Sequence, residues 1–330
     1  MNLGVPLGLS SGLCWGAADF FGGIQSRRLP ALTVAFWSQV AGALVLAGAL
    51  AILALQGIRP AGPEVAWGLA AGVGSGCALA LFYRALAEGT MSVVAPISAC
   101  GAIVPVTAAL LSGDQPGTLA ALGVVTAITG VVLVSRPTSG PTATSPGPTA
   151  MSPGATAQPP ASAPQSAGAD RHPGTPGRAG RVVAMALGSA LGFGLFYVFV
   201  DAGTAAAEGT AAAARTSGSH GSPLWVIAGA RMSSLVILST IALAGRRPAL
   251  RWPGRRIGAV ALVGVGDTGA NLLFAYAATT GNLAVVGVLG SLYPVATVIL
   301  ARWLLGERLS GGQNAGVALA LTGVGLLAAA

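Results

Sequence analysis

Long apolar runs, separated by short polar turns, repeat along the whole chain. Ten of these runs approach or exceed the roughly 20 apolar residues that a helix needs to cross a bilayer. They are predicted at Leu3–Ile24, Leu32–Leu55, Val65–Ala87, Met91–Leu111, Thr118–Ser135, Val182–Asp201, Pro223–Leu243, Ile257–Thr279, Leu283–Leu304 and Gly312–Ala329. Several connections are short, such as Glu88–Thr90, so neighbouring helices are expected to be antiparallel. The pattern predicts an all-α integral membrane protein of ten transmembrane helices.

Composition indicates a surface covered by lipid. The 330 residues are 53% hydrophobic and 8% charged, whereas soluble domains average about 25% charged residues. The net charge of +8 raises the alternative of a nucleic-acid-binding protein. However, the arginines stand between the apolar runs, and no basic face with interleaved aromatic residues is found. We therefore expect a lipid bilayer, and no nucleic acid, as the macromolecular environment.

One segment has a different composition. Residues 136–181 hold ten of the 21 prolines, contain no Phe, Tyr or Trp, and are otherwise rich in Ala, Ser, Thr and Gly. Such a segment cannot bury enough apolar surface to offset the entropy of ordering. We predict a disordered linker that carries no site. A shorter polar stretch, Ala202–Ser222, is predicted to connect the sixth and seventh helices.

The linker divides the chain into two halves, the predicted domains 1–135 and 182–330, whose sequences match. One set of residues in the first half recurs in the second at constant spacing: Gly113-Asp114, Gly123 and Thr129-Gly130-Val131 match Gly306-Glu307, Gly316 and Thr322-Gly323-Val324. A second set does the same: Phe82, Gly89 and Val93-Val94 match Phe274, Gly281 and Val285-Val286. Because each half is predicted to have an odd number of helices, the halves are expected to be inverted repeats.

Short motifs stand in a fixed order in the two halves. They are Trp15-Gly16, Asp19-Phe20, the turns Gly113-Asp114 and Leu305-Gly306-Glu307-Arg308, and the glycine spacing of the fifth and tenth helices. In this order they resemble the EamA-type ten-helix branch of the drug/metabolite transporter superfamily. The resemblance covers the chain except the linker, which is longer than is usual in that family. It implies secondary transport of a small metabolite, amino acid or drug, and it names no substrate.

Ionisable side chains inside apolar helices are the first candidates for a substrate or coupling-ion site, because a charge in a bilayer is costly unless it faces a polar interior. Asp267 lies near the middle of the eighth helix, with Asn271 one turn later on the same face. Two roles stay open for Asp267: a functional carboxylate, or a structural partner of Arg231. In the first half, the counterparts of Asp267 and Arg231 are Ser75 and Gln39.

Other candidates come from the first and sixth helices and from proline positions. Trp15 and Asp19 share a face, and Asp19 either binds a cation or an amine or is solvated at the interface. Tyr197 is the candidate of the sixth helix. Helix breaks, which often border transporter sites, are predicted at Pro96, Pro105 and Pro294. Arg84 and Glu88 are expected to form an i,i+4 ion pair, and Glu307 to cap a helix or shape a turn.

The expected function is a secondary transporter that works by alternating access. The alternatives are a sugar uptake permease of the glucose/ribose type, an uncoupled facilitator, and a non-catalytic structural subunit of the membrane. No enzyme is expected, because the sequence has no Walker loop, nucleophile elbow or HExxH motif. No cofactor or metal is expected either, since Cys14, Cys77 and Cys100 lack metal-ligand spacing. The oligomeric state, monomer or homodimer, stays open.

Arginine positions predict the orientation in the inner membrane. One side would carry most of them: Arg27, Arg28, Arg136, Arg171, Arg178, Arg181, Arg246, Arg247, Arg251, Arg255, Arg256 and Arg308. The opposite side would carry Arg59 and Arg215. The positive-inside rule then places the linker in the cytoplasm and both termini outside. The family resemblance implies cytoplasmic termini instead, so the two inferences disagree.

Overall fold

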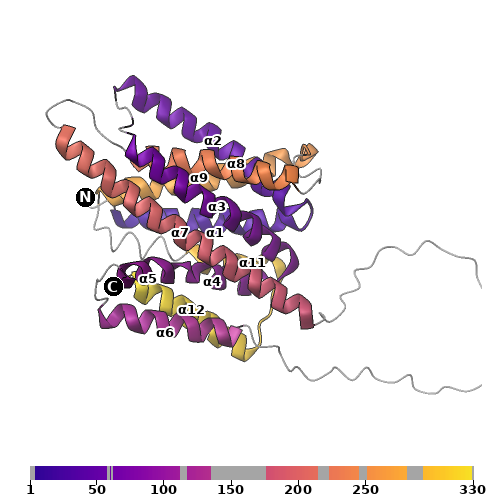
Figure 1. Cartoon of the computed structure of the whole chain (residues 1–330). Helices are drawn as coiled ribbons and strands as arrows, with labels where there is room; N and C mark the ends of the chain where they lie inside the picture. Colours follow the sequence, from indigo (N-terminus) through magenta and orange to yellow (C-terminus); the bar gives the residue numbers. More distant parts are fainter. Residues whose placement is uncertain are drawn as a thin grey trace, which may run out of the picture.

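The structure, a computed structural model, describes residues 4–57, 60, 62–111, 117–134, 176–214, 223–244, 251–280 and 293–328. These residues form helices and no strand (Figure 1). The α-helices are α1 (Gly4–Ser26), α2 (Ala31–Leu55), α3 (Pro63–Glu88), α4 (Met91–Ala99), α5 (Ile103–Leu111), α6 (Thr118–Val134), α7 (Pro176–Ala214), α8 (Pro223–Ala244), α9 (Ile257–Thr280), α11 (Tyr293–Leu305) and α12 (Gly311–Ala328). Two 3₁₀ turns, η1 (Cys100–Ala102) and η2 (Gly254–Arg256), precede α5 and α9.

The described helices have the length and the exterior of a multi-pass membrane protein. Five segments are long and apolar enough to cross a bilayer: Ala31–Leu55, Pro63–Glu88, Gly177–Val200, Leu224–Ala244 and Gly254–Phe274. Large apolar side chains face outward, and Leu44, Leu55 and Trp303 are 71%, 88% and 84% exposed. An apolar exterior of this extent is stable in lipid and not in water. α1 begins and α12 ends on the same side of the molecule (Figure 1).

Helix α7 is longer at both ends than the predicted membrane segment Val182–Asp201, although its membrane-spanning part, Gly177–Val200, ends within one residue of the prediction. α7 begins at Pro176, inside the predicted linker, because proline fits the first turn of a helix. It continues to Ala214, inside the predicted polar connection, because residues 202–214 are rich in alanine, the strongest helix former. The predicted linker residues 136–175 lie outside the described residues.

The predicted helix Met91–Leu111 is interrupted. Its first part is α4, its last part is α5, and the 3₁₀ turn Cys100–Ala102 lies between them. Pro105 has no N–H to donate to the carbonyl of Gly101, which explains the break one turn before the proline. Of the predicted helix Leu283–Leu304, the structure describes Tyr293–Leu305, and residues 281–292 lie outside the described part.

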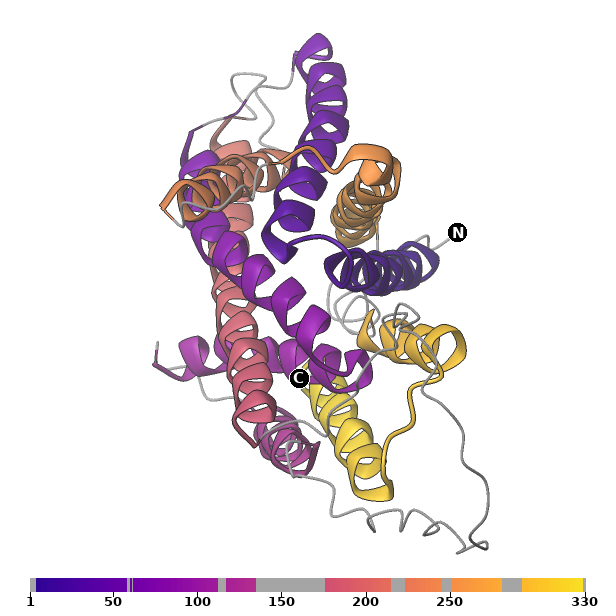
Figure 2. The same ribbon diagram turned by 90° about the vertical axis from the view of Figure 1, so that its right-hand side faces the viewer.

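The two halves pack against each other in matching pairs of helices. α3 of the first half packs against α7 and α8, and its counterpart α9 packs against α1 and α2. Likewise α5 packs against α7, and its counterpart α11 packs against α1. Figure 2 shows α1 between α9 and α11. These contacts between the halves thus occur in pairs that correspond when the first half is aligned on the second.

Glycines make these contacts close, and they do so at corresponding positions. A side chain at Gly72 of α3 would strike the carbonyl of Ala230 in α8, and one at Gly264 of α9 would strike the carbonyl of Ser38 in α2. The alignment that pairs Ser75 with Asp267 also pairs Gly72 with Gly264 and Ser38 with Ala230. The contact of Gly72 with Ala230 therefore corresponds to the contact of Gly264 with Ser38 when the first half is aligned on the second.

The same relation holds for α6 and α12, which lie side by side (Figure 1). A side chain at Gly130 would strike the backbone of Ala320, and one at Gly323 would strike the backbone of Ala127. These glycines belong to the matching motifs found in the sequence. Backbone-to-backbone contact of this kind is the usual means by which membrane helices associate, because lipid supplies no hydrophobic force between them.

A leucine at Gly264 is expected to lower the stability of the folded protein by about 1–3 kcal/mol or more, because it overpacks the contact between α9 and α2. Gly269→Leu is the matched control on the same helix, since no atom lies within 4 Å of the position that its Cβ would take. The unfolding midpoints of both variants in detergent measure the effect. Equal midpoints for Gly264→Leu and the unsubstituted protein would show that α2 and α9 do not pack as described.

Candidate functional site

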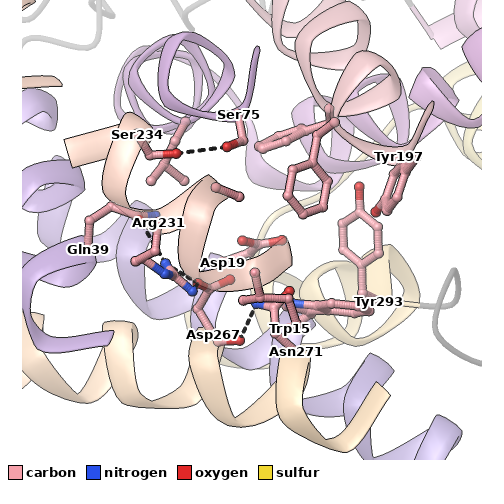
Figure 3. Close-up of a pocket in the computed structure, with 15 residues that line it drawn as sticks. Trp15, Asp19, Gln39, Ser75, Tyr197, Arg231, Ser234, Asp267, Asn271 and Tyr293 are labelled. Atoms are coloured by element: carbon pink, nitrogen blue, oxygen red, sulfur yellow. Dashed lines mark hydrogen bonds and ion pairs between the residues drawn. The ribbon is translucent and has the colours of Figure 1, made fainter. Parts of the chain in front are cut away.

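A polar cavity lies between the two halves, among helices that are otherwise apolar. Its volume is about 110 Å³, well above the roughly 10–15 Å³ that one water molecule requires. Helices α1, α2 and α3 of the first half and α7, α8, α9 and α11 of the second supply its walls. The lining residues are Trp15, Asp19, Gln39, Ser75, Leu79, Phe193, Phe196, Tyr197, Ile227, Ala230, Arg231, Ser234, Asp267, Asn271 and Tyr293 (Figure 3).

Arg231 and Asp267 form an ion pair on one wall. Both guanidinium nitrogens, Nη1 and Nη2, donate to Asp267 Oδ2 at 2.9 Å. Nη2 also donates to Thr268 Oγ1 at 3.1 Å, and Nη1 to Gln39 Oε1 at 2.6 Å. The Arg231 side chain is 7% exposed and that of Asp267 is 32% exposed. The arginine is therefore held by the protein, whereas the aspartate still reaches the cavity.

Arg231 and Gln39 are equivalent positions of the two halves, and their side chains are hydrogen-bonded to each other. They therefore mark the place where the halves meet. Asp267, the ionic partner of Arg231, belongs to the second half, and the equivalent position of the first half is Ser75. The hydroxyl of Ser75 lies 2.8 Å from that of Ser234. The charged pair is present in one half and replaced by neutral polar groups in the other, so the cavity is chemically asymmetric.

Asp19 lies in the same cavity, two turns before the end of α1. Among the residues that the structure describes, none forms a hydrogen bond or ion pair with its carboxylate, and Figure 3 draws no dashed line to it. Asp267, the other described acidic residue of the lining, faces the same cavity from α9. α1 is fixed around Asp19 by Ser11 Oγ, which donates to Ala270 O at 2.8 Å, and by Thr297 Oγ1, which donates to Gly16 O at 3.0 Å.

The structure brings together all six residues that the sequence suggested for substrate or coupling-ion binding. They come from four helices and line one cavity: Trp15, Asp19, Tyr197, Arg231, Asp267 and Asn271. Asn271 Nδ2 donates to the backbone oxygen of Asp267 at 2.7 Å, so part of its hydrogen-bonding capacity is used within α9.

Several lining residues were not among the sequence candidates. Tyr293, Phe193 and Phe196 contribute aromatic rings, and Gln39 and Ser75 contribute polar groups. Some signals were present in the sequence: Phe193, Phe196 and Tyr197 share one helical face, and Gln39 is a polar residue in the middle of an apolar helix. Neither signal shows whether these side chains face the cavity or the lipid. Only the packing of the helices identifies them as lining residues.

Pro96 and Pro294 are not among the described residues that line the cavity, and the side chain of Pro105 lies outside the described part. Pro96 and Pro105 lie on either side of the 3₁₀ turn η1, within α4 and α5. Gly101 of this turn packs against the backbone of Ala190 in α7. Pro294 is the second residue of α11, where a proline costs no hydrogen bond within the described helix. It follows Tyr293, which does line the cavity.

A second set of polar contacts joins the halves at one end of the helices. Glu307 Oε1 accepts from Met91 N at 3.1 Å and from Arg27 Nη2 at 3.2 Å. Its Oε2 accepts from Ser92 N and Ser92 Oγ, both at 2.9 Å. The predicted capping role of Glu307 is confirmed, and the helix that it caps is α4 of the other half. Gly306, with φ +62°, makes the turn that presents Glu307.

The α3 end beside Glu307 carries further ion pairs. Arg84 Nε lies 3.0 Å from Glu88 Oε1, which confirms the predicted i,i+4 pair. Arg181 Nη2 of α7 reaches Glu88 Oε2 at 3.1 Å. These side chains are more exposed than Glu307, so their ion pairs contribute less to stability.

Glu307→Ala is expected to destabilise the protein by about 1–3 kcal/mol, because the variant loses the charged cap of α4 and the partner of Arg27. Arg84→Gln, which breaks an exposed pair, is the control and should cost about 0.5 kcal/mol or less. Thermal unfolding in detergent distinguishes them. If both variants unfold at the same temperature as the unsubstituted protein, the cap contributes nothing to stability.

The comparisons with known proteins agree with this geometry. No curated protein matches the chain. A solved structure described only as a protein crystal structure has 15% identity and a TM-score of 0.56, with 98% of this chain and 95% of that chain covered, and it shows likeness of fold alone. Residues 2–136 and 180–329 each match the EamA-like transporter family. The chain therefore belongs to the EamA-like transporter family and is a multi-pass membrane transporter of the drug/metabolite transporter superfamily.

Proposed function

We propose that the protein is a secondary transporter that moves one small solute at a time by alternating access, and that the cavity around Asp19, Arg231 and Asp267 is the solute site. The observation that carries the proposal is the placement of charged groups from both halves around a cavity in an otherwise apolar molecule. Charges at such a depth are costly and are usually retained for a transport pathway.

The architecture that we propose has ten transmembrane helices in two inverted repeats, residues 1–135 and 182–330, joined by a linker without a site. The helix contacts support this architecture. The contacts of α3 with α7 and α8 correspond to those of α9 with α1 and α2 when one half is aligned on the other. The contact between Gln39 and Arg231 also supports it, since equivalent residues touch only near a symmetry axis. Rocking of one repeat against the other around a fixed site is the motion that such a fold allows.

The proposed location is the inner cell membrane, with the arginine-rich ends of the helices in the cytoplasm. The ion pairs of Arg27, Arg84 and Arg181 are consistent with a hydrated interface at that end.

Two alternatives are weaker. A structural subunit would have no need of a cavity of about 110 Å³ with three ionisable side chains. A sugar permease would be expected to offer several neutral hydrogen-bonding groups to its ligand. Here the neutral groups of Gln39, Ser75, Ser234 and Asn271 already form hydrogen bonds within the protein, whereas the carboxylate of Asp19 has no partner among the described residues.

A thermal-shift screen of the purified protein tests the proposal. The classes of solute to compare are amino acids, sugars, nucleosides and organic cations. Binding at 100 times Kd should stabilise the protein by about 2.7 kcal/mol. We expect at least one class to raise the unfolding midpoint, and the same solute to enter proteoliposomes that contain the protein. Uptake equal to that of empty liposomes for every solute of the four classes would contradict the proposal.

A further inference from the structure

The only arginine among the described lining residues is already occupied. Arg231 donates to Gln39, Thr268 and Asp267 through both terminal nitrogens, and its side chain is 7% exposed. A solute anion would have to break these charge-assisted bonds before it could bind the guanidinium. The cavity is therefore poorly suited to an anionic solute, although it contains an arginine.

The carboxylates, in contrast, have unused capacity. Asp267 receives both guanidinium bonds on Oδ2, and no residue in the described part of the chain donates to its Oδ1. Asp19 has no hydrogen-bonding or ionic partner among the described residues. With one arginine and two aspartates, the described lining has a formal charge of −1. Residues 281–292 contain no ionisable side chain, so they do not change this balance.

The rest of the lining favours an organic cation. Five aromatic side chains line the cavity beside Asp19: Trp15, Phe193, Phe196, Tyr197 and Tyr293. Figure 3 shows Trp15, Tyr197 and Tyr293 arranged around the space that Asp19 faces. The face of an aromatic ring attracts a cation, and it attracts most strongly where water is excluded. A bare metal ion would instead need several oxygen ligands, which this wall of rings does not supply.

We propose that the solute is a small organic monocation, a quaternary ammonium or a protonated amine, with Asp19 as its counterion and the aromatic side chains as its walls. This inference rests on the proposed transport function and specifies its substrate class. Arg231 and Asp267 form the neutralised side of the site, and the free Oδ1 of Asp267 is a second acceptor for an N–H of the solute. The cavity volume of about 110 Å³ favours a small solute.

Binding of two probes of equal shape tests the charge requirement. Choline is the cation, and 3,3-dimethylbutan-1-ol is its neutral analogue, with carbon in place of nitrogen. Titration calorimetry of the purified full-length protein is expected to show choline binding about tenfold or more tightly than the alcohol. Equal affinity, failure of choline to bind, or preferential binding of acetate would each overturn the inference. This comparison uses the unsubstituted protein, so it does not depend on whether any variant folds.

The Asp19→Asn variant then tests whether the Asp19 carboxylate is the counterion of the bound cation. The variant should bind choline about tenfold or more weakly and the alcohol with unchanged affinity. Glu88→Gln is the matched control, because it removes a carboxylate at the end of α3, away from the cavity, and it should bind choline as before. Choline binding that survives Asp19→Asn within about twofold would overturn the assignment of Asp19.

Failure of this inference can be told apart from failure of the proposed function. A neutral or anionic solute that stabilises the protein and enters proteoliposomes would leave the transporter intact and refute the monocation. If no solute of any class is transported, the proposed function itself fails.

Discussion

Asp267→Asn and Arg231→Gln are each expected to reduce the yield of folded protein sharply, by a destabilisation of about 3–5 kcal/mol. Asp267→Asn leaves the buried Arg231 guanidinium without its counterion, and Arg231→Gln leaves the half-buried Asp267 carboxylate without one. The loss is greatest for Asp267→Asn, because the Arg231 guanidinium is 7% exposed whereas the Asp267 side chain is 32% exposed. Size-exclusion chromatography of detergent extracts and the unfolding midpoint measure the effect.

The double variant Arg231→Gln/Asp267→Ser should recover most of the lost stability. It gives the second half the neutral residues that stand at the equivalent positions of the first half, Gln39 and Ser75, so the fold already accommodates these residues once. Replacement of a buried ion pair by neutral groups is often neutral in stability, whereas removal of one partner is not. A double variant as unstable as either single variant would show that the orphaned charge is not the cause.

Asn271→Trp is expected to reduce solute flux to the level of empty liposomes. Asn271 faces the cavity from α9, and an indole at this position would take much of the available volume of about 110 Å³. The control is Leu262→Trp on the same helix, where the side chain is 67% exposed on the outside of the protein. Leu262→Trp should transport at the unsubstituted rate. Equal rates for both variants would mean that solute does not pass through this cavity.

The helices could be predicted largely from the sequence, because a bilayer requires long apolar segments whose backbone groups are bonded internally. The predicted helix ends were inaccurate where features other than the requirement of the bilayer determine the helix. The ends of α7 extend past the apolar segment because proline and alanine favour helix regardless of lipid. The break at Cys100–Ala102 was indicated by Pro105, but a proline does not show how far a helix is unwound.

The candidate site could be predicted in part. Acidic and basic groups within apolar helices are rare, so Asp19, Arg231 and Asp267 stood out, and the structure places them in one cavity. Their division of roles could not be predicted. The sequence indicated that Asp267 is either a functional group or a partner of Arg231. The hydrogen-bond geometry shows that Arg231 is bound to Asp267. It also shows that Asp19 has no partner among the described residues.

The capping of α4 by Glu307 shows the same limit. The sequence indicated a cap, because an acidic residue follows a glycine turn just before a helix. It could not show that the capped helix belongs to the other half, since that depends on how the halves meet.

Accessibility of the cavity from both sides of the membrane tests the central claim most directly. We suggest Asn271→Cys in a protein with Cys14, Cys77 and Cys100 replaced by alanine, and Leu262→Cys as the lipid-facing control. A membrane-impermeant maleimide is applied to intact spheroplasts and to inverted vesicles. Alternating access predicts that Cys at position 271 reacts from each side and that Cys at position 262 reacts from neither. Reaction of position 271 from one side only, or from neither, would contradict the account.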